Sequence, residues 1–363
     1  MKNIPEIELP ELTSKSGVKT IDVDTFLSNP DSVILDIRSP SEYSIGHIER
    51  ARSFPLFTDE ERAEVGTIYK KIGKEQAIEK GLEFVGKRLH LYVRDAKAMG
   101  RSKEFYLYCW RGGMRSRSMA WLLSTAGFNV SLLSGGYKAY RQSFETYVAK
   151  DWKFISILGG TGSGKTELLN ELEREGEQVL DLEGLANHKG SVFGGFGLGD
   201  QPSTEEFINR IHNKLRSFDW QRRVWVEGES IMVGSCFIPN ELYDKLIASP
   251  YFVVEMSMQE RVERLTIEYG SFSAEMVEQA FVKVSKRMGY NNVREAIDSF
   301  KAGDVKRAVE LALIYYDKGY SAASEKRTGE NIGLLTLTGH NHREVAQTLK
   351  NILVSGKNFK CSI

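Results

Sequence analysis

The chain has few of the features that mark secreted, membrane-spanning or strongly charged proteins. It holds only three cysteines in 363 residues, Cys109, Cys236 and Cys361, and no two of them form a CxxC pair. This spacing argues against a cysteine zinc site or a disulfide framework and favours a reducing compartment. Lysines and arginines balance aspartates and glutamates at 49 each, so the net charge is +0. The overall charge therefore gives no sign of a polyanionic partner, and it does not exclude one. A local basic face can still bind RNA on a neutral protein.

Long apolar runs are also missing. No stretch approaches the roughly 20 apolar residues that span a bilayer, and the acidic start, broken by Pro5 and Pro10, does not resemble a signal peptide. We therefore expect a cytoplasmic protein without a membrane partner. The hydrophobic fraction of 41% and the charged fraction of 27% are ordinary for globular proteins, and the length indicates two domains.

The first half of the chain alternates strand-like and helix-like segments. Apolar runs predict strands over 32–37, 105–108 and 130–133, and an amphipathic pattern predicts a helix over 114–126. Such alternation is typical of a parallel sheet covered by helices. We predict an α/β domain over residues 1–150, with a charged, helical insertion at about 58–102.

The second half restarts the same pattern after Asp151. Predicted strands lie over 153–158, 178–182, 223–227 and 251–255, with a helix that begins at Lys165. We predict a second parallel-sheet domain over residues 151–363, with a helical region at about 259–320.

One cysteine lies where a strand passes into a helix. The sequence from this point comprises Cys109, Trp110, Arg111, Gly112, Gly113, Met114, Arg115 and Ser116. A loop that curls into a helix N-terminus directs backbone amides inward, which stabilises a thiolate and a bound anion. We predict that Cys109 and Arg115 are catalytic and that the remaining residues form an anion loop. The alternative is a buried structural cysteine, which is the role we expect of Cys236; Cys361 we assign to the tail.

A second glycine-rich loop follows the strand over 153–158. Its residues, which fit GxxxxGK[ST], are Gly159, Gly160, Thr161, Gly162, Ser163, Gly164, Lys165 and Thr166. Between a strand and a helix, this motif binds a di- or triphosphate through backbone amides, with Lys165 neutralising charge and Thr166 reaching a metal ion. Glu227 and Glu229 follow another strand and are candidate metal ligands or bases, although a strand-end role is an equal alternative for them. Asp181 and Glu183 follow a further strand and are weaker candidates for the same roles.

The first half resembles rhodanese-like domains. The resemblance rests on the cysteine loop, on the segment 35–43 and on Gly46-His47-Ile48. Five residues separate Cys109 from Arg115, one more than in the usual sulfur-carrying rhodanese loop and closer to the related phosphatase-type loops. A wider loop suits a larger group, such as selenium or a phosphate-bearing donor.

Both loops together resemble the selenophosphate-dependent tRNA 2-selenouridine synthase family. Further matching strings lie at 66–73, 180–191 and 226–230. The resemblance implies a rhodanese-like domain followed by a P-loop NTPase-like domain, and a tRNA partner that carries wobble 2-thiouridine. It implies S-geranylation with geranyl diphosphate, followed by selenation with selenophosphate. Cys109 would carry selenium as a perselenide-like adduct or help to deliver it, and Lys165 and Thr166 would hold the diphosphate. A Mg²⁺ requirement and the oligomeric state are left open.

The site of RNA contact is open at this point. Arg111 and Arg117 flank Cys109, and a helical stretch further on is rich in cations and tyrosines. That stretch contains Lys283, Lys286, Arg287, Tyr290, Arg294, Lys301, Lys306, Arg307, Tyr315, Tyr316 and Tyr320, with Lys326 and Arg327 beyond it. Because acidic residues are interspersed, a solvated helix surface is the alternative for any one of them.

Two other functions fit the same motifs. A rhodanese-type sulfurtransferase fused to an ATP-dependent kinase or NTPase module would hydrolyse nucleotide and move sulfur from thiosulfate. A regulatory protein that senses anions and nucleotides would keep its function when Cys109 is replaced by alanine.

Overall fold

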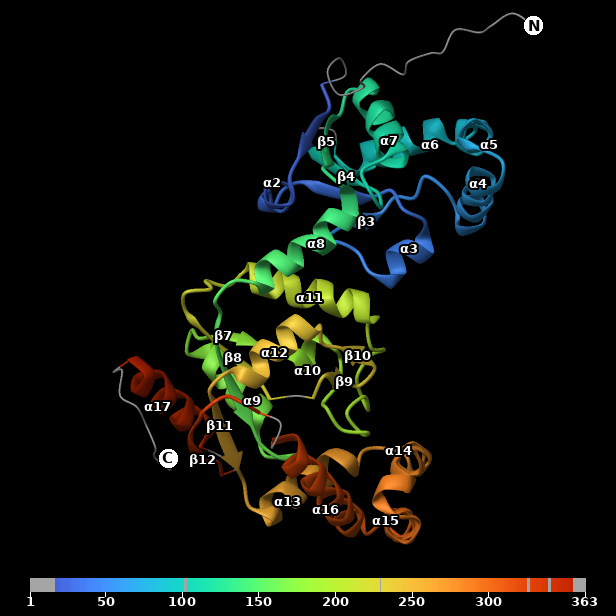
Figure 1. Cartoon of the computed structure of the whole chain (residues 1–363). Helices are drawn as coiled ribbons and strands as arrows, with labels where there is room; N and C mark the ends of the chain where they lie inside the picture. Colours follow the sequence, from blue (N-terminus) through green and yellow to red (C-terminus); the bar gives the residue numbers. More distant parts are fainter. Residues whose placement is uncertain (1–16, 101–102, 229, 325–326, 339–340, 355–363) are drawn as a thin grey trace, which may run out of the picture. The chain divides into compact units, whose positions relative to one another are not determined.

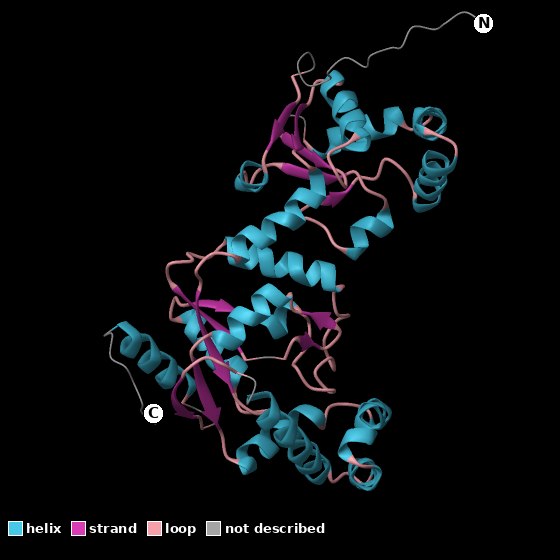
Figure 2. Cartoon of the chain, in the orientation of Figure 1, coloured by secondary structure: helices cyan, strands magenta, loops and turns pink. Residues whose placement is uncertain are grey.

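The computed structural model describes residues 17–100, 103–228, 230–324, 327–338 and 341–354 (Figures 1 and 2). The chain divides into two compact units, Met1–Thr146 and Tyr147–Ile363. Within the described ranges, no helix is long and apolar enough to cross a membrane. Cys361 and Glu229 lie outside the described residues, as does Lys326.

The first unit contains a five-stranded sheet in which every pair of neighbours is parallel, in the order β1-β5-β4-β2-β3. The strands are β1 (Lys19–Ile21), β2 (Val33–Asp36), β3 (Arg52–Ser53), β4 (Glu104–Tyr108) and β5 (Asn129–Leu133). All four residues of β2 are buried, as expected for a parallel strand covered on both faces. The predicted parallel sheet is therefore confirmed.

In the part of this unit that the structure describes, seven helices accompany the sheet, and three of them are inserted between β3 and β4. They are α2 (Val23–Ser28), α3 (Pro40–Ile45), α7 (Met114–Thr125) and α8 (Gly136–Val148), with α4 (Asp59–Lys71), α5 (Lys74–Gly86) and α6 (Leu89–Met99) between β3 and β4. Helix α4 begins at a capping box in which Thr58 and Glu61 satisfy each other's backbone amides. A buried Tyr92 on α6 donates to the Leu56 carbonyl at 2.9 Å, which attaches the inserted helices to the sheet.

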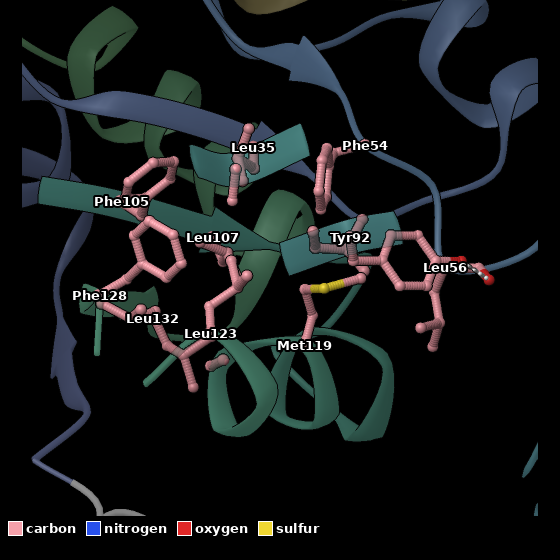
Figure 3. Close-up of a cluster of buried hydrophobic side chains, with 14 of the residues drawn as sticks. Leu35, Phe54, Leu56, Tyr92, Phe105, Leu107, Met119, Leu123, Phe128 and Leu132 are labelled. Carbon is pink, nitrogen blue, oxygen red and sulfur yellow. Dashed lines mark hydrogen bonds between the residues drawn. The ribbon is translucent and has the colours of Figure 1, made fainter. Parts of the chain in front are cut away.

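The core of the first unit positions the cysteine loop. Leu35 and Leu107 from the sheet lie near Met119 and Leu123 of α7 (Figure 3). Each such side chain contributes about 1.5–3 kcal/mol when fully buried. Cys109 belongs to the same buried cluster. The end of β4 and the start of α7 are thus held in place by apolar packing on both sides of the cysteine.

The second unit contains another five-stranded parallel sheet, in the order β12-β11-β6-β8-β7. The strands are β6 (Lys153–Leu158), β7 (Gln178–Leu180), β8 (Arg223–Glu227), β11 (Tyr251–Glu255) and β12 (Asn331–Thr336). Because β6 is central and β8 lies beside it, the loop after β6 and the carboxyl end of β8 share one edge of the sheet. This edge is where ligands bind in open α/β sheets.

The remaining elements of the second unit fall into two groups. Around the sheet lie α9 (Lys165–Arg174), α10 (Leu182–Leu185), α11 (Thr204–Arg216), α12 (Asn240–Ala248), α17 (His342–Val354) and the hairpin of β9 (Met232–Val233) and β10 (Cys236–Phe237). A helical region is formed by α13 (Met258–Tyr269), α14 (Ala274–Met288), α15 (Tyr290–Lys301) and α16 (Val305–Ser324). Phe193, from the loop after α10, is buried among the side chains of this region.

Two local predictions can be compared with this architecture. The strand predicted over 178–182 ends at Leu180, because the Asp181 side chain accepts the Gly184 N–H and begins α10. Cys236 is fully buried on β10, as predicted for a core cysteine.

Candidate active site

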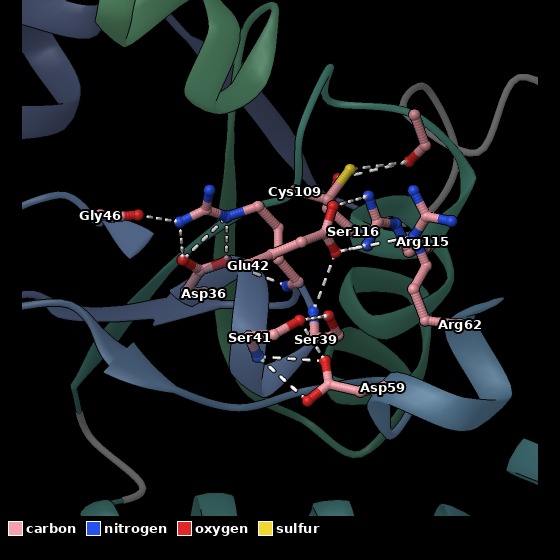
Figure 4. A network of polar contacts seen from close by, with 12 residues as sticks. Asp36, Ser39, Ser41, Glu42, Gly46, Asp59, Arg62, Cys109, Arg115 and Ser116 are labelled. Carbon is pink, nitrogen blue, oxygen red and sulfur yellow. Dashed lines mark hydrogen bonds and ion pairs between the residues drawn. The ribbon is translucent and has the colours of Figure 1, made fainter. Parts of the chain in front are cut away.

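The first candidate site is the cysteine loop, residues 109–116, which joins β4 to α7 (Figure 4). Cys109 directly follows β4 and is only 3% exposed. Its Sγ lies 3.2 Å from the Ser116 Oγ and 4.0 Å from the Gly113 carbonyl oxygen. The Ser116 hydroxyl donates to the Gly113 carbonyl oxygen at 3.3 Å, so Ser116 connects the sulfur to the first turn of α7.

The backbone at the start of α8 approaches the cysteine loop closely and determines the conformation of the loop. Gly136, the first residue of α8, has a φ of 62°, and a Cβ there would overlap the Cys109 carbonyl oxygen and the Gly112 amide nitrogen. The next residue, Tyr137, donates its N–H to the Cys109 carbonyl at 2.9 Å. Only glycine combines this backbone angle with this contact at low cost.

The arginine of the loop is held by a carboxylate from another helix. Arg115 Nη1 donates to Glu42 Oε2 at 2.6 Å, and Arg62 Nε of α4 lies 3.7 Å from the same oxygen (Figure 4). Burial raises the pKa of Glu42, but the hydrogen bond and charge of Arg115 outweigh it and lower the pKa overall. Arg115 is therefore engaged by Glu42, and any anion at the cysteine loop must share Arg115 with Glu42 or displace Glu42.

The outer side of the loop is open to solvent. Trp110, Arg111 and Met114 are all exposed, and so is Arg117 on α7, whose Nε donates to the Gly112 carbonyl at 3.2 Å. The loop that holds the buried sulfur and the first turns of α7 thus expose an aromatic ring, two guanidinium groups and a thioether to solvent. This combination suits contact with an unstacked base and its phosphates.

The second candidate site is the phosphate loop, residues 159–166, between β6 and α9 in the second unit. Lys165 and Thr166 are the first two residues of α9, and the Lys165 Nζ donates to the Gly159 carbonyl at 2.7 Å. The Ser163 side chain is turned into the loop, with 2% of the residue exposed. A loop of amides before a helix N-terminus, with a lysine folded over it, forms a site for a diphosphate group.

Acidic side chains lie beside this loop but differ in what they can do. Glu227, at the end of β8, is fully buried, and its Oε2 accepts the Leu182 N–H at 2.9 Å. Burial first, and then the charges of Asp181 and Glu183, raise the pKa of Glu227 well above its ordinary value. Through its contact with the Leu182 N–H, Glu227 holds the start of α10.

The oxygens that suit a cation are those next to Thr166. Glu183 Oε2 lies 3.5 Å from the Thr166 Oγ1, whereas Asp181 Oδ1 is engaged by the Gly184 N–H. Among the described residues, no group of three His, Cys, Asp or Glu side chains could hold a metal ion. Thr166 and Glu183 fit Mg²⁺ of the kind that is bound by one or two protein oxygens together with phosphate and water.

An arginine from the helical region also reaches the phosphate loop. Arg261 on α13 is buried; its Nε donates to the Thr161 carbonyl at 2.8 Å, and its Nη atoms donate to Asp317 of α16 at 2.7 and 3.0 Å. Arg264, also on α13, pairs with Glu167 at 2.5 Å. Two cations of one helix therefore connect the helical region to the loop and to the helix that follows it.

Glu183 is one of the acidic candidates of the sequence analysis, whereas sequence reasoning missed Glu42 and Arg261 as parts of these sites. For Glu42 a signal exists, because Ser39 and Glu42 form a capping box that marks a helix start. Its pairing with Arg115, which lies far along the chain, is not visible in any local pattern. Arg261 carries no motif at all, and only the folded structure places it at the phosphate loop.

Three residues of the predicted RNA-contact stretch are engaged in internal contacts. Lys301 pairs with Glu278 at 2.6 Å, and Arg307 pairs with Glu295 at 2.7 Å. Tyr316 receives the Val192 N–H at 2.9 Å. These contacts favour the alternative of a solvated, ion-paired helix surface for the residues involved.

Comparisons with known families cover both units. Residues 21–143 match the rhodanese-like domain, and residues 152–307 match the family described as tRNA 2-selenouridine synthase AAA domain. Among solved structures, the N-terminal domain of a putative ATP/GTP binding protein from Clostridium difficile 630 is 41% identical. It covers 34% of this chain and 98% of that chain, with a TM-score of 0.34.

Two curated relatives are similar over most of the chain. The tRNA 2-selenouridine synthase of Bordetella petrii is 32% identical over an alignment of 372 positions, which covers 91% of this chain and 96% of the relative. That of Pseudomonas fluorescens is 35% identical over 332 residues, covering 86% of this chain and 87% of the relative. The resemblance inferred from the two loops is confirmed: this chain is an enzyme that belongs to the tRNA 2-selenouridine synthase family.

Proposed function

We propose that the chain converts wobble 2-thiouridine in tRNA to 2-selenouridine in two steps, each at one of the two loops. The observation that carries this proposal is the presence of two separate loops, each leading from a strand into a helix N-terminus, in a chain of this family. One has a thiol beside it, Cys109, and the other has the phosphate-loop lysine, Lys165. Two different phosphorus-containing co-substrates, geranyl diphosphate and selenophosphate, require two such sites.

The first step uses geranyl diphosphate at the phosphate loop. The thiocarbonyl sulfur of the base attacks the first carbon of the geranyl group, the carbon–oxygen bond to the diphosphate breaks, and the base loses its N3 proton. The loop amides and Lys165 stabilise the departing diphosphate, and its oxygens replace the Gly159 carbonyl as the acceptor of the Lys165 ammonium. A Mg²⁺ ion held at Thr166 and Glu183 would add charge stabilisation.

The second step uses selenophosphate at the cysteine loop. Selenium adds to C2 of the base, geranylthiol leaves, and water removes the phosphate. Loop amides and Arg115 hold the phosphate while Glu42 gives up part of its contact with Arg115. We assign Cys109 to the delivery of selenium rather than to a stable perselenide, because forming a perselenide from selenophosphate would require an oxidant or the loss of phosphite.

The test is mass spectrometry of nucleosides after incubation of 2-thiouridine tRNA with both co-substrates. We expect wild type to yield 2-selenouridine, Cys109→Ala to stop at the S-geranylated nucleoside, and Lys165→Ala to leave 2-thiouridine. If wild type leaves the RNA unchanged but hydrolyses ATP or moves sulfur from thiosulfate, the proposal fails and the sulfurtransferase–NTPase alternative replaces it.

A further inference from the structure

One matched sequence string has no role in either candidate site. The string, residues 66–73, covers the end of α4 and the two residues before α5. We call residues 69–74, which include Lys74 at the start of α5, the α4–α5 turn. Two large side chains of this turn project into solvent: Tyr69 is 59% exposed and Ile72 is 68% exposed. Single exposed apolar residues are common, but an aromatic and an aliphatic side chain three residues apart form a continuous apolar surface on a helix end.

The same turn contains three lysines. Lys70 and Lys71 end α4, Lys74 begins α5, and all three are exposed. Within the described part of the chain, none of them forms an ion pair, whereas cations of the neighbouring helices do: Lys80 pairs with Glu64 and Glu83, and Arg88 with Glu61.

Helix electrostatics explain only part of this arrangement. Lysines in the last turn of a helix stabilise its dipole, which accounts for Lys70 and Lys71. Lys74 lies in the first turn of α5, where a positive charge is unfavourable for the helix. The stability of the helices therefore does not explain why the turn with the exposed Tyr69 contains a third lysine.

The turn is on the same helix as a residue next to the cysteine loop. Arg62 of α4 lies 3.7 Å from Glu42, which pairs with Arg115 of the loop (Figure 4). The seven residues from Arg62 to Tyr69 rise about 10 Å along the helix. About three stacked nucleotides span that length, at roughly 3.4 Å each.

We propose that the α4–α5 turn is an RNA-binding surface of the first unit. Tyr69 stacks on an unpaired base of the tRNA, and Lys70, Lys71 and Lys74 contact phosphates near the nucleotide that reacts at Cys109. Aromatic stacking and phosphate contacts together are the usual means of binding single-stranded loops. This inference rests on the proposed function, since it takes a tRNA substrate as given.

The test compares tRNA affinity and its salt dependence among variants of the full chain. We expect Lys70→Glu/Lys71→Glu to weaken binding at least tenfold. The slope of log K against log salt should become shallower by about 1.4, because two phosphate contacts are lost and each contributes about 0.7. Tyr69→Ala should weaken binding about tenfold without changing the slope, and Tyr69→Phe should bind like wild type.

A matched control reverses two charges elsewhere in the same unit. Lys19 begins β1 and Lys103 precedes β4, so both lie at the amino-terminal edge of the parallel sheet, opposite the edge where Cys109 follows β4. Both are exposed, and Lys19→Glu/Lys103→Glu should bind tRNA like wild type. Alkylation of Cys109 at the wild-type rate would show that each variant keeps its fold around the loop.

Failure of this inference is distinguishable from failure of the proposed function. If wild type itself does not bind tRNA, the proposed function fails. If wild type binds but Lys70→Glu/Lys71→Glu and Tyr69→Ala bind equally well with the same salt slope, the RNA surface lies elsewhere. That outcome would overturn the inference and leave the turn to a protein partner. Equal weakening by the Lys19→Glu/Lys103→Glu control would also overturn it, because the effect would then be one of net charge.

Discussion

Two glycines beside the buried thiol differ in what a methyl group would meet. A Cβ at Gly136 would overlap the Cys109 carbonyl oxygen, whereas a Cβ at Gly113 has no atom within 4 Å. We expect Gly136→Ala to destabilise the protein by about 2 kcal/mol or more, from the overlap and the positive φ. Gly113→Ala should change stability by less than about 1 kcal/mol.

Chemical denaturation would measure the stability of each variant. The rate of alkylation of Cys109 would report on the shape of the loop, with peptide mass spectrometry used to distinguish Cys109 from Cys236. Equal behaviour of the two alanine variants would show that the contact between α8 and the cysteine loop does not determine the loop's shape.

The pair of Glu42 and Arg115 predicts a pH dependence of stability. Arg115 lowers the pKa of Glu42 overall, despite the opposing effect of burial. A carboxylate with a lowered folded-state pKa contributes stability above its unfolded pKa, about 4.5, and loses that contribution as the pH falls through the folded value.

We therefore expect Glu42→Gln to cost about 1 kcal/mol at pH 7 and progressively less below about pH 4.5. Denaturation midpoints of both proteins over this pH range would measure the difference. A difference that stays constant from pH 7 to pH 3 would contradict the pairing.

At the scale of elements, α13 connects the helical region to the phosphate loop through two arginines of unequal burial. Arg261 is buried and bonded to Thr161 and Asp317, whereas Arg264 pairs with Glu167 nearer to solvent. We expect Arg261→Ala to destabilise the second unit by about 2 kcal/mol and to weaken pyrophosphate binding, because the loop carbonyl loses its donor.

Arg264→Ala is the matched control, with an expected cost of about 0.5 kcal/mol and unchanged pyrophosphate binding. Denaturation and titration calorimetry would measure the two quantities. If both variants bind pyrophosphate like wild type, Arg261 supports the helical region alone and not the phosphate loop.

Strands with continuous apolar runs were predictable from the sequence, as β2, β6 and β8 show. Strands β1 and β3 have only three and two residues, which is too short for an alternation of apolar and polar residues to be recognised. The sequence therefore did not predict them. The same distinction holds for the sites. The two loops carry motifs, whereas the contacts of Glu42 and Arg261 join segments far apart in the chain and arise only on folding.

At the scale of the whole molecule, the family relationship assigns one activity to a chain with two candidate anion sites. The central claim is that each site serves one step, with the cysteine loop acting after the phosphate loop. Each unit has its own sheet and its own buried core. A substitution in one loop should therefore leave the chemistry of the other intact.

The most direct test supplies the intermediate from outside. S-geranyl-2-thiouridine tRNA and selenophosphate would be given to Lys165→Ala and to Cys109→Ala, without geranyl diphosphate, and the nucleosides analysed by mass spectrometry. We predict 2-selenouridine from Lys165→Ala at a rate near that of wild type, and unchanged S-geranylated nucleoside from Cys109→Ala. A folded Lys165→Ala that fails to convert the supplied intermediate, or a Cys109→Ala that converts it, would contradict the assignment of the two steps to two sites.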